Sequence, residues 1–151
     1  MTAFTAQTDD YEQRVRDSLA RQNALTLMGA KLLRVLPGQV ELDLAHDDRL
    51  TQQHGFIHAG ITTTLLDSAC GYAAFSLMPA DAGVLTVELK TSLLAPADGE
   101  RFVFEGRVLK AGRTLSFCEG RGYAIKQGQE KLIATMSATM MTVTGRSAVQ
   151  G

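Results

Sequence analysis

Alternating apolar and polar residues dominate the second half of the chain. In residues 84–94 the two kinds of side chain alternate over most of the segment: Leu85, Val87, Leu89 and Leu93 are interleaved with Thr86, Glu88, Lys90 and Ser92. A period of two places successive side chains on opposite faces and predicts a half-buried strand. Residues 101–109, 113–125 and 131–143 are similar and are separated by short turns that each contain glycine. We therefore predict four strands, joined mostly by hairpins.

The first half of the chain predicts a helix followed by two strands. Apolar residues recur every four positions from Tyr11 to Leu19, after an acidic start, which indicates an amphipathic helix ending near Asn23. Residues 27–36 and 39–45 are strand-like and flank the turn signal Pro37-Gly38. The second of these segments alternates cleanly between apolar and acidic residues: Val40, Glu41, Leu42, Asp43 and Leu44.

Between the two halves, residues 59–78 form an apolar run with a single charged residue, Asp67. A helix that is apolar on almost every side must be buried in a protein core or in lipid. Desolvation of a carboxylate in such a helix raises its pKa, and strongly perturbed carboxylates mark candidate functional sites. The alternative is a structural carboxylate that accepts a hydrogen bond from Thr63 or Thr64. A charge in mid-membrane costs at least ~2.5 kcal/mol, so we favour a protein core over a membrane.

Composition narrows the classes of protein. The chain has 151 residues, 45% of them hydrophobic and 21% charged, which predicts one soluble domain spanning residues 1–151. A net charge of −1 gives no electrostatic case for nucleic acid or for an anionic membrane. Cys70 and Cys118 form neither a disulfide framework nor a metal-spaced set, and the first residues lack the pattern of a secretion signal. We therefore expect a cytoplasmic location and no metal. The order of elements predicts an α+β fold in which an antiparallel sheet curls around one buried helix.

One combination of residues resembles a known family. Gln52 is followed six positions later by His58-Ala59-Gly60, and Asp67 lies nine positions after the histidine. This spacing resembles the hotdog-fold thioesterases, specifically the PaaI-like acyl-coenzyme A group linked to phenylacetate degradation, in which the central motif is His-Gly-Gly. Residues 87–97 look like the third strand of that family and residues 109–115 like its Gly-Arg hairpin. The likeness covers about residues 25–143. It departs from the family at Ala59, which replaces a glycine, and at Gly71, where some relatives carry a hydroxyl residue.

The resemblance implies a hotdog fold, with about six antiparallel strands around one long central helix and an additional N-terminal helix. It also implies hydrolysis of an acyl-coenzyme A (acyl-CoA) thioester to free acid and coenzyme A, without a cofactor. The expected assembly is a homodimer with its sites at the subunit interface, and often a tetramer built as a dimer of dimers.

The same resemblance suggests a role for each candidate residue. Asp67 is the expected general base or nucleophile. The backbone N–H groups of Ala59 and Gly60 are the expected oxyanion donors, with Gln52 as a further donor and His58 orienting the loop or the thioester. Four residues are expected to contact the substrate: Thr86, Arg113, Leu66 and Cys70. Thr86 would orient water and Arg113 would meet coenzyme A phosphates, although the alternation places Thr86 on the face of Glu88 and Lys90, away from the leucines.

Helix geometry bears on the assembly. Asp67 lies eight residues beyond Ala59, which is about 12 Å of helix rise. This distance is too long for both groups to act on one carbonyl within a single helix, so we expect donors and carboxylate to come from different subunits.

Two other functions stay open. One is a hydratase or dehydratase of acyl thioesters on the same fold, although the His-Phe-Pro stretch of such enzymes does not occur here. The other is a non-catalytic acyl-binding module. The sequence predicts neither the length nor the aromaticity of the acyl group, and the thiol carrier is either coenzyme A or an acyl carrier protein.

Overall fold

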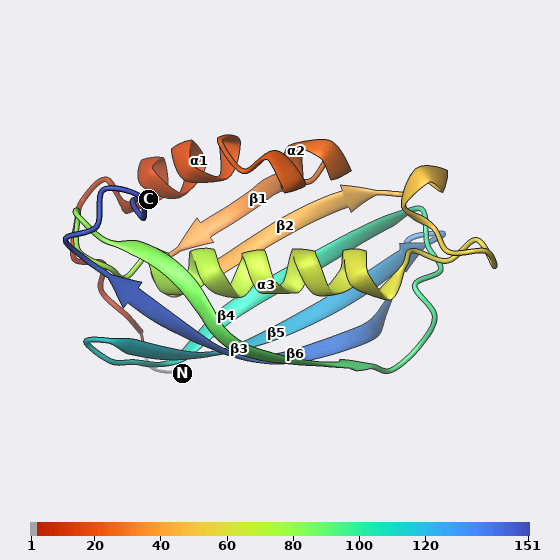
Figure 1. Cartoon of the computed structure of the whole chain (residues 1–151). Helices are drawn as coiled ribbons and strands as arrows, with labels where there is room; N and C mark the ends of the chain where they lie inside the picture. Colours follow the sequence, from red (N-terminus) through yellow and green to blue (C-terminus); the bar gives the residue numbers. More distant parts are fainter. Residues whose placement is uncertain (1–2) are drawn as a thin grey trace.

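The computed structural model describes residues 3–151; residues 1 and 2, which belong to the predicted domain, lie outside the described residues. The helices are α1 (Tyr11–Ala20), α2 (Asn23–Met28) and α3 (Ala59–Phe75), with a short 3-10 helix at Asp48–Leu50. The strands are β1 (Lys31–Leu36), β2 (Gln39–Ala45), β3 (Gly83–Leu93), β4 (Arg101–Ala111), β5 (Leu115–Lys126) and β6 (Gln129–Val143). The predicted α+β fold, a six-stranded sheet with one long central helix and an N-terminal helix, is confirmed (Figure 1).

All strand pairings are antiparallel, and the strand order is β1-β2-β4-β5-β6-β3. The sheet curves around α3, while α1 and α2 lie beside β1 at one end of the sheet (Figure 1). β3 forms the opposite edge, so one side of its backbone has no strand to pair with in the single chain.

Close contact between α3 and the sheet depends on Gly106 in β4. A Cβ atom at this position would lie 2.2 Å from the carbonyl carbon of Ala69. Only glycine therefore lets the backbones of α3 and β4 touch. The side chains of Leu66 and Cys70 are fully buried and lie next to Gly120 of β5. Both pack against the sheet in the single chain and line neither of the two cavities described below, so their contact with the substrate stays a prediction.

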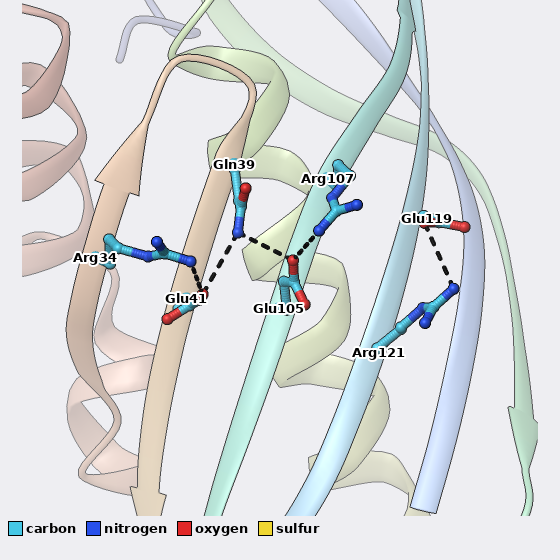
Figure 2. Close-up of polar contacts among 7 residues, drawn as sticks. All are labelled: Arg34, Gln39, Glu41, Glu105, Arg107, Glu119 and Arg121. Atoms are coloured by element: carbon cyan, nitrogen blue, oxygen red, sulfur yellow. Dashed lines mark hydrogen bonds and ion pairs between the residues drawn. The ribbon is translucent and has the colours of Figure 1, made fainter. Parts of the chain in front are cut away.

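The two faces of the sheet differ as the alternation in β2 predicts. Val40, Leu42 and Leu44 are fully buried on the face toward α3. The opposite face carries a row of charged and amide side chains, shown in Figure 2: Arg34, Gln39, Glu41, Glu105, Arg107, Glu119 and Arg121. The Gln39 amide links Glu41 to Glu105, at 3.4 and 3.0 Å, and Arg107 donates to Glu105 at 2.7 Å. The pattern of β2 is therefore confirmed as one buried face and one solvated face.

The prediction of a strand over residues 27–36 is wrong in its first part. Residues 23–28 form α2, and Leu27 is 80% exposed on it. Gly29 ends this helix in the left-handed conformation, with φ of 75°, and the Ala30 N–H donates to the carbonyl of Leu25. The first helix also ends earlier than predicted, at Ala20, and α3 ends at Phe75. No helix among residues 3–151 is long and apolar enough to cross a membrane.

Candidate active site

Asp67 lies on the one flank of α3 that the fold leaves open. Gly60, Thr63, Thr64 and Asp67 recur at three- and four-residue spacing and are exposed or half-buried, whereas the rest of the helix beyond Thr64 is buried. The run of small and apolar residues therefore does not enclose the carboxylate within the core of the single chain. This corrects the expectation of a fully buried Asp67, because three of the four residues on this flank are polar and one is glycine.

The hydrogen-bond partner of Asp67 is Thr86, whose Oγ1 donates to Oδ1 over 2.7 Å. The two threonines considered as structural partners bond elsewhere: Thr63 donates to the Thr91 hydroxyl and Thr64 to the carbonyl of Gly60. The alternative prediction, that Asp67 accepts a hydrogen bond from Thr63 or Thr64, is therefore wrong. What remains is a half-buried carboxylate held by one hydroxyl from the neighbouring strand.

A β-bulge explains why the alternation misplaced Thr86. The register of β3 against β6 shifts between Thr86 and Glu88, so these residues do not share a face. Thr86 pairs with the fully buried Met140, on the side of α3. Glu88 instead accepts a hydrogen bond from Thr139 at 3.0 Å. The bulge turns the hydroxyl of Thr86 toward α3 and gives Asp67 its donor.

Asp67 and Thr86 line a cavity of about 440 Å³ between α3, β3, the connection between α1 and α2, and the C-terminal residues 149–151. Three more of its lining residues, which the sequence analysis missed, form a hydrogen-bonded chain. The Ser68 hydroxyl donates to Gln22 Oε1 at 3.1 Å, and Gln22 Nε2 donates to the Tyr72 hydroxyl at 3.2 Å. The spacing of Ser68, Gln22 and Tyr72 along the chain gives no signal that separates them from helix residues without a function.

His58 caps the start of α3. It has the extended conformation of an N-cap residue, with φ of −61° and ψ of 139°, and its Nδ1 accepts a hydrogen bond from the Gly60 N–H at 2.8 Å. The Gly60 N–H is therefore already bonded, which corrects its predicted role as a free oxyanion donor. Ala59 keeps its N–H without a partner among the described residues. Since Gln127 is the one non-glycine residue with positive φ in residues 3–151, alanine is unstrained at position 59.

A second cavity, of about 600 Å³, opens at this helix start and is lined by Gln52, His58, Ala59 and mainly apolar residues such as Leu93. The side-chain oxygen of Gln52 accepts a hydrogen bond from the His54 N–H. Its NH₂ group has no partner among residues 3–151, so it is available as a donor. Gln53 does not line this cavity. Of the two competing amides, the structure therefore places Gln52 next to Ala59.

The remaining candidate, Arg113, lies apart from both cavities. It lines a different pocket of about 330 Å³ near Leu77 and Pro79, beyond the C-terminal end of α3. The single chain therefore collects the predicted residues into two groups, one around Ala59 and one around Asp67. It does not bring Arg113 to either group.

The thiols of Cys70 and Cys118 are buried and protonated, and hence unreactive. Burial raises the pKa of Cys118 to about 12 and raises the pKa of Cys70 well above its ordinary value. Within residues 3–151 no group of three His, Cys, Asp or Glu side chains is placed to hold a metal ion.

Comparison with known proteins assigns the chain to a family. The model of the family described as Thioesterase superfamily matches residues 54–131, more than half of the chain. A thioesterase family protein from Silicibacter pomeroyi has 56% identity, covers 89% of this chain and 99% of its own, and superposes with a TM-score of 0.88. The human acyl-coenzyme A thioesterase 13 is 28% identical over 116 residues, which are 76% of this chain and 82% of the human protein. A phenylacetic acid degradation-related protein from Ralstonia eutropha shares the fold, with 22% identity, a TM-score of 0.75 and coverage of 88% and 99%.

Proposed function

The chain belongs to the thioesterase superfamily and is a thioester hydrolase, and from this premise we propose that it hydrolyses acyl-CoA thioesters at a site shared by two subunits. The proposal rests on one observation: the site residues form two separate groups, one around Ala59 and one around Asp67. A carboxylate with its hydroxyl partner lies in one cavity, and an unbonded helix N–H with a free amide lies in another. About 12 Å of helix rise separates them within one chain.

In the proposed reaction, Asp67 accepts a proton from water as the water oxygen attacks the thioester carbon. The carbonyl oxygen becomes an oxyanion, stabilised by the Ala59 N–H at the positive end of α3 and by the Gln52 amide. Collapse of this intermediate breaks the C–S bond, and the proton on Asp67 passes to the departing thiolate. The products are a carboxylic acid and coenzyme A. Direct attack by Asp67, through an anhydride that water then cleaves, gives the same products.

A second copy of the chain is proposed to supply the missing half of each site. The free edge strand β3 carries exposed apolar residues, of which Val87 is 55% and Leu93 56% exposed. An uncovered edge of this length and character invites pairing with another strand. Antiparallel pairing of two β3 strands about a two-fold axis would cover both edges and place two α3 helices side by side. Such a homodimer has two equivalent sites, and a tetramer made from two of these dimers has four.

The first test replaces Asp67 by Asn, which keeps size and polarity but removes the base. We expect release of free thiol from acyl-CoA to fall by about 10²-fold or more. Unchanged thiol release would favour a non-catalytic acyl-binding module. Addition of water to an enoyl thioester with the C–S bond intact would favour a hydratase.

The oxyanion donor has an equally specific test. Ala59 is the first residue of α3, where proline is well tolerated, and the φ and ψ of His58 suit a residue that precedes proline. Ala59→Pro therefore removes one N–H with little strain, and we expect kcat to fall about 10²- to 10³-fold. Ala59→Ser keeps the N–H and is the matched control.

Mixing the two inactive variants decides whether a site is shared. In a dimer of one Asp67→Asn and one Ala59→Pro subunit, one site has both intact groups and the other has neither. Refolding an equal mixture should restore roughly a quarter of the wild-type activity, because about half of the dimers are mixed. If each chain carries a complete site of its own, mixing restores nothing.

A further inference from the structure

Gly71 is a glycine in the middle of α3 for which the packing gives no reason. A Cβ atom built on it would meet no atom within 4 Å. This differs from Gly106 and Gly120, whose Cβ atoms would lie 2.2 and 3.1 Å from neighbouring atoms. Glycine inside a helix is less favourable than alanine, so its presence here is not explained by stability.

The empty space at Gly71 belongs to the cavity that contains Asp67. Gly71 follows Asp67 by one helical turn, and both line the same volume of about 440 Å³. A cavity of this size is within the range of small-molecule sites. A larger side chain at position 71 would project into it, directly beyond the carboxylate.

One wall of this cavity is polar and includes Ser68, Gln22 and Tyr72. Tyr72 lies five residues beyond Asp67, about 7.5 Å of helix rise. Its hydroxyl approaches Ser18 Oγ at 3.4 Å and accepts a hydrogen bond from Gln22. Burial raises the pKa of Tyr72, which keeps the phenol in its O–H form. The Gln22 amide donates one of its two N–H groups to Tyr72 and accepts one hydrogen bond from Ser68. One N–H and one oxygen lone pair of this amide remain, so it can bind another polar group.

From this arrangement we infer that the acyl group of the substrate enters the cavity past Gly71 and ends in a hydroxyl that binds Gln22 and Tyr72. The inference rests on the proposed function, because it takes Asp67 as the reacting group at the mouth of the cavity. The absent side chain of Gly71 sets the depth of the pocket. The hydrogen-bonded chain along its wall selects a hydroxylated acyl group over a plain one of the same length. A plain acyl group leaves Gln22 and Tyr72 without a hydrogen bond to the substrate.

Size selection is tested with acetyl-CoA and hexanoyl-CoA as probes. Gly71→Leu should lower kcat/KM for hexanoyl-CoA at least about tenfold and change that for acetyl-CoA less than about threefold. Gly71→Ala should cause a smaller change in the same direction and should raise the melting temperature, because its methyl group meets no atom. It therefore serves as the folded variant if the leucine variant does not fold. Equal loss of activity for both probes, or no loss for either, would overturn the assignment of the pocket.

Selection for a hydroxyl is tested with ω-hydroxyhexanoyl-CoA against hexanoyl-CoA. The wild-type protein should prefer the hydroxylated probe by about tenfold in kcat/KM, and Tyr72→Phe should remove most of that preference. A merely structural role for the hydroxyl of Tyr72 would lower both rates and leave their ratio unchanged. Equal rates for the two probes with the wild-type protein would overturn this part of the inference.

These results are separable from the proposed function. If Asp67→Asn leaves thiol release unchanged, the proposed function fails and the inference fails with it. If Asp67 is required but acyl selectivity does not respond to Gly71, only the inference fails. In that case changes at Leu93, which lines the other cavity, should alter the selectivity instead.

Discussion

Replacing Gly106 by alanine tests how closely α3 must approach the sheet for both folding and catalysis. The added Cβ atom would lie 2.2 Å from the Ala69 carbonyl carbon, 2.3 Å from its oxygen and 2.4 Å from the Cys70 nitrogen. All three are backbone atoms, so no side chain can rotate out of the way. To reach ordinary contact at 3.4 Å, the helix and strand have to separate by about 1 Å or more at this point.

The expected cost follows from this geometry. Overpacking a core costs about 1–3 kcal/mol, and the upper end applies here because a helix backbone has to move. For a chain of this size each kcal/mol lowers the melting temperature by about 2–4 °C, so Gly106→Ala should melt roughly 6–12 °C below the wild-type protein. The shift also moves Asp67 relative to Thr86, and a displacement of about 1 Å at a catalytic group can lower the rate about 10²-fold.

The assay is thermal unfolding by circular dichroism, at one protein concentration because an oligomer melts in a concentration-dependent way. Gly71→Ala is the matched control: the substitution is the same and lies on the same helix, but its Cβ atom meets nothing. That variant should melt about 2–4 °C above the wild-type protein. If Gly106→Ala melts within about 2 °C of wild type, the claim that the backbones of α3 and β4 touch is refuted.

Three further changes have defined outcomes. Thr86→Val removes the 2.7 Å donor to Asp67 and should lower kcat up to about tenfold, whereas Thr86→Ser keeps a hydroxyl donor and should restore it. His58→Ala removes the cap on the Gly60 N–H and should lower the free energy of unfolding in urea by about 1 kcal/mol, while His58→Asn should lower it less. Cys118, with a pKa raised by burial from 9.0 to about 12, should not react with a thiol reagent near pH 8 until the chain is unfolded. The Cys118 thiol loses its proton near pH 9 in the unfolded chain and only near pH 12 in the folded chain. The free energy of unfolding should therefore fall as the pH rises from about 9 to about 12. Measured over the same pH range, the Cys118→Ala variant should show a smaller fall.

Local sequence signals located most strands well but missed one helix. The period of two in β2 predicted its limits because successive side chains there lie alternately on the buried and the solvated face, which periodicity reports directly. Residues 23–28 gave no such signal: the helix has only six residues and exposes Leu27, and its end depends on the left-handed conformation of Gly29. In β3 the alternation itself misled, because a bulge reverses the face of each residue beyond it.

The sequence by itself determined most of the elements, the fold class and the spacing of Gln52, His58, Ala59 and Asp67, because all of these follow from patterns along one chain. Only the tertiary structure decided which groups meet. It gave Asp67 the hydroxyl of Thr86 and placed Gln22 beside Tyr72. These contacts join residues through strand register and helix packing, both of which depend on where distant segments lie. A pattern of residue types along the chain carries no record of those positions.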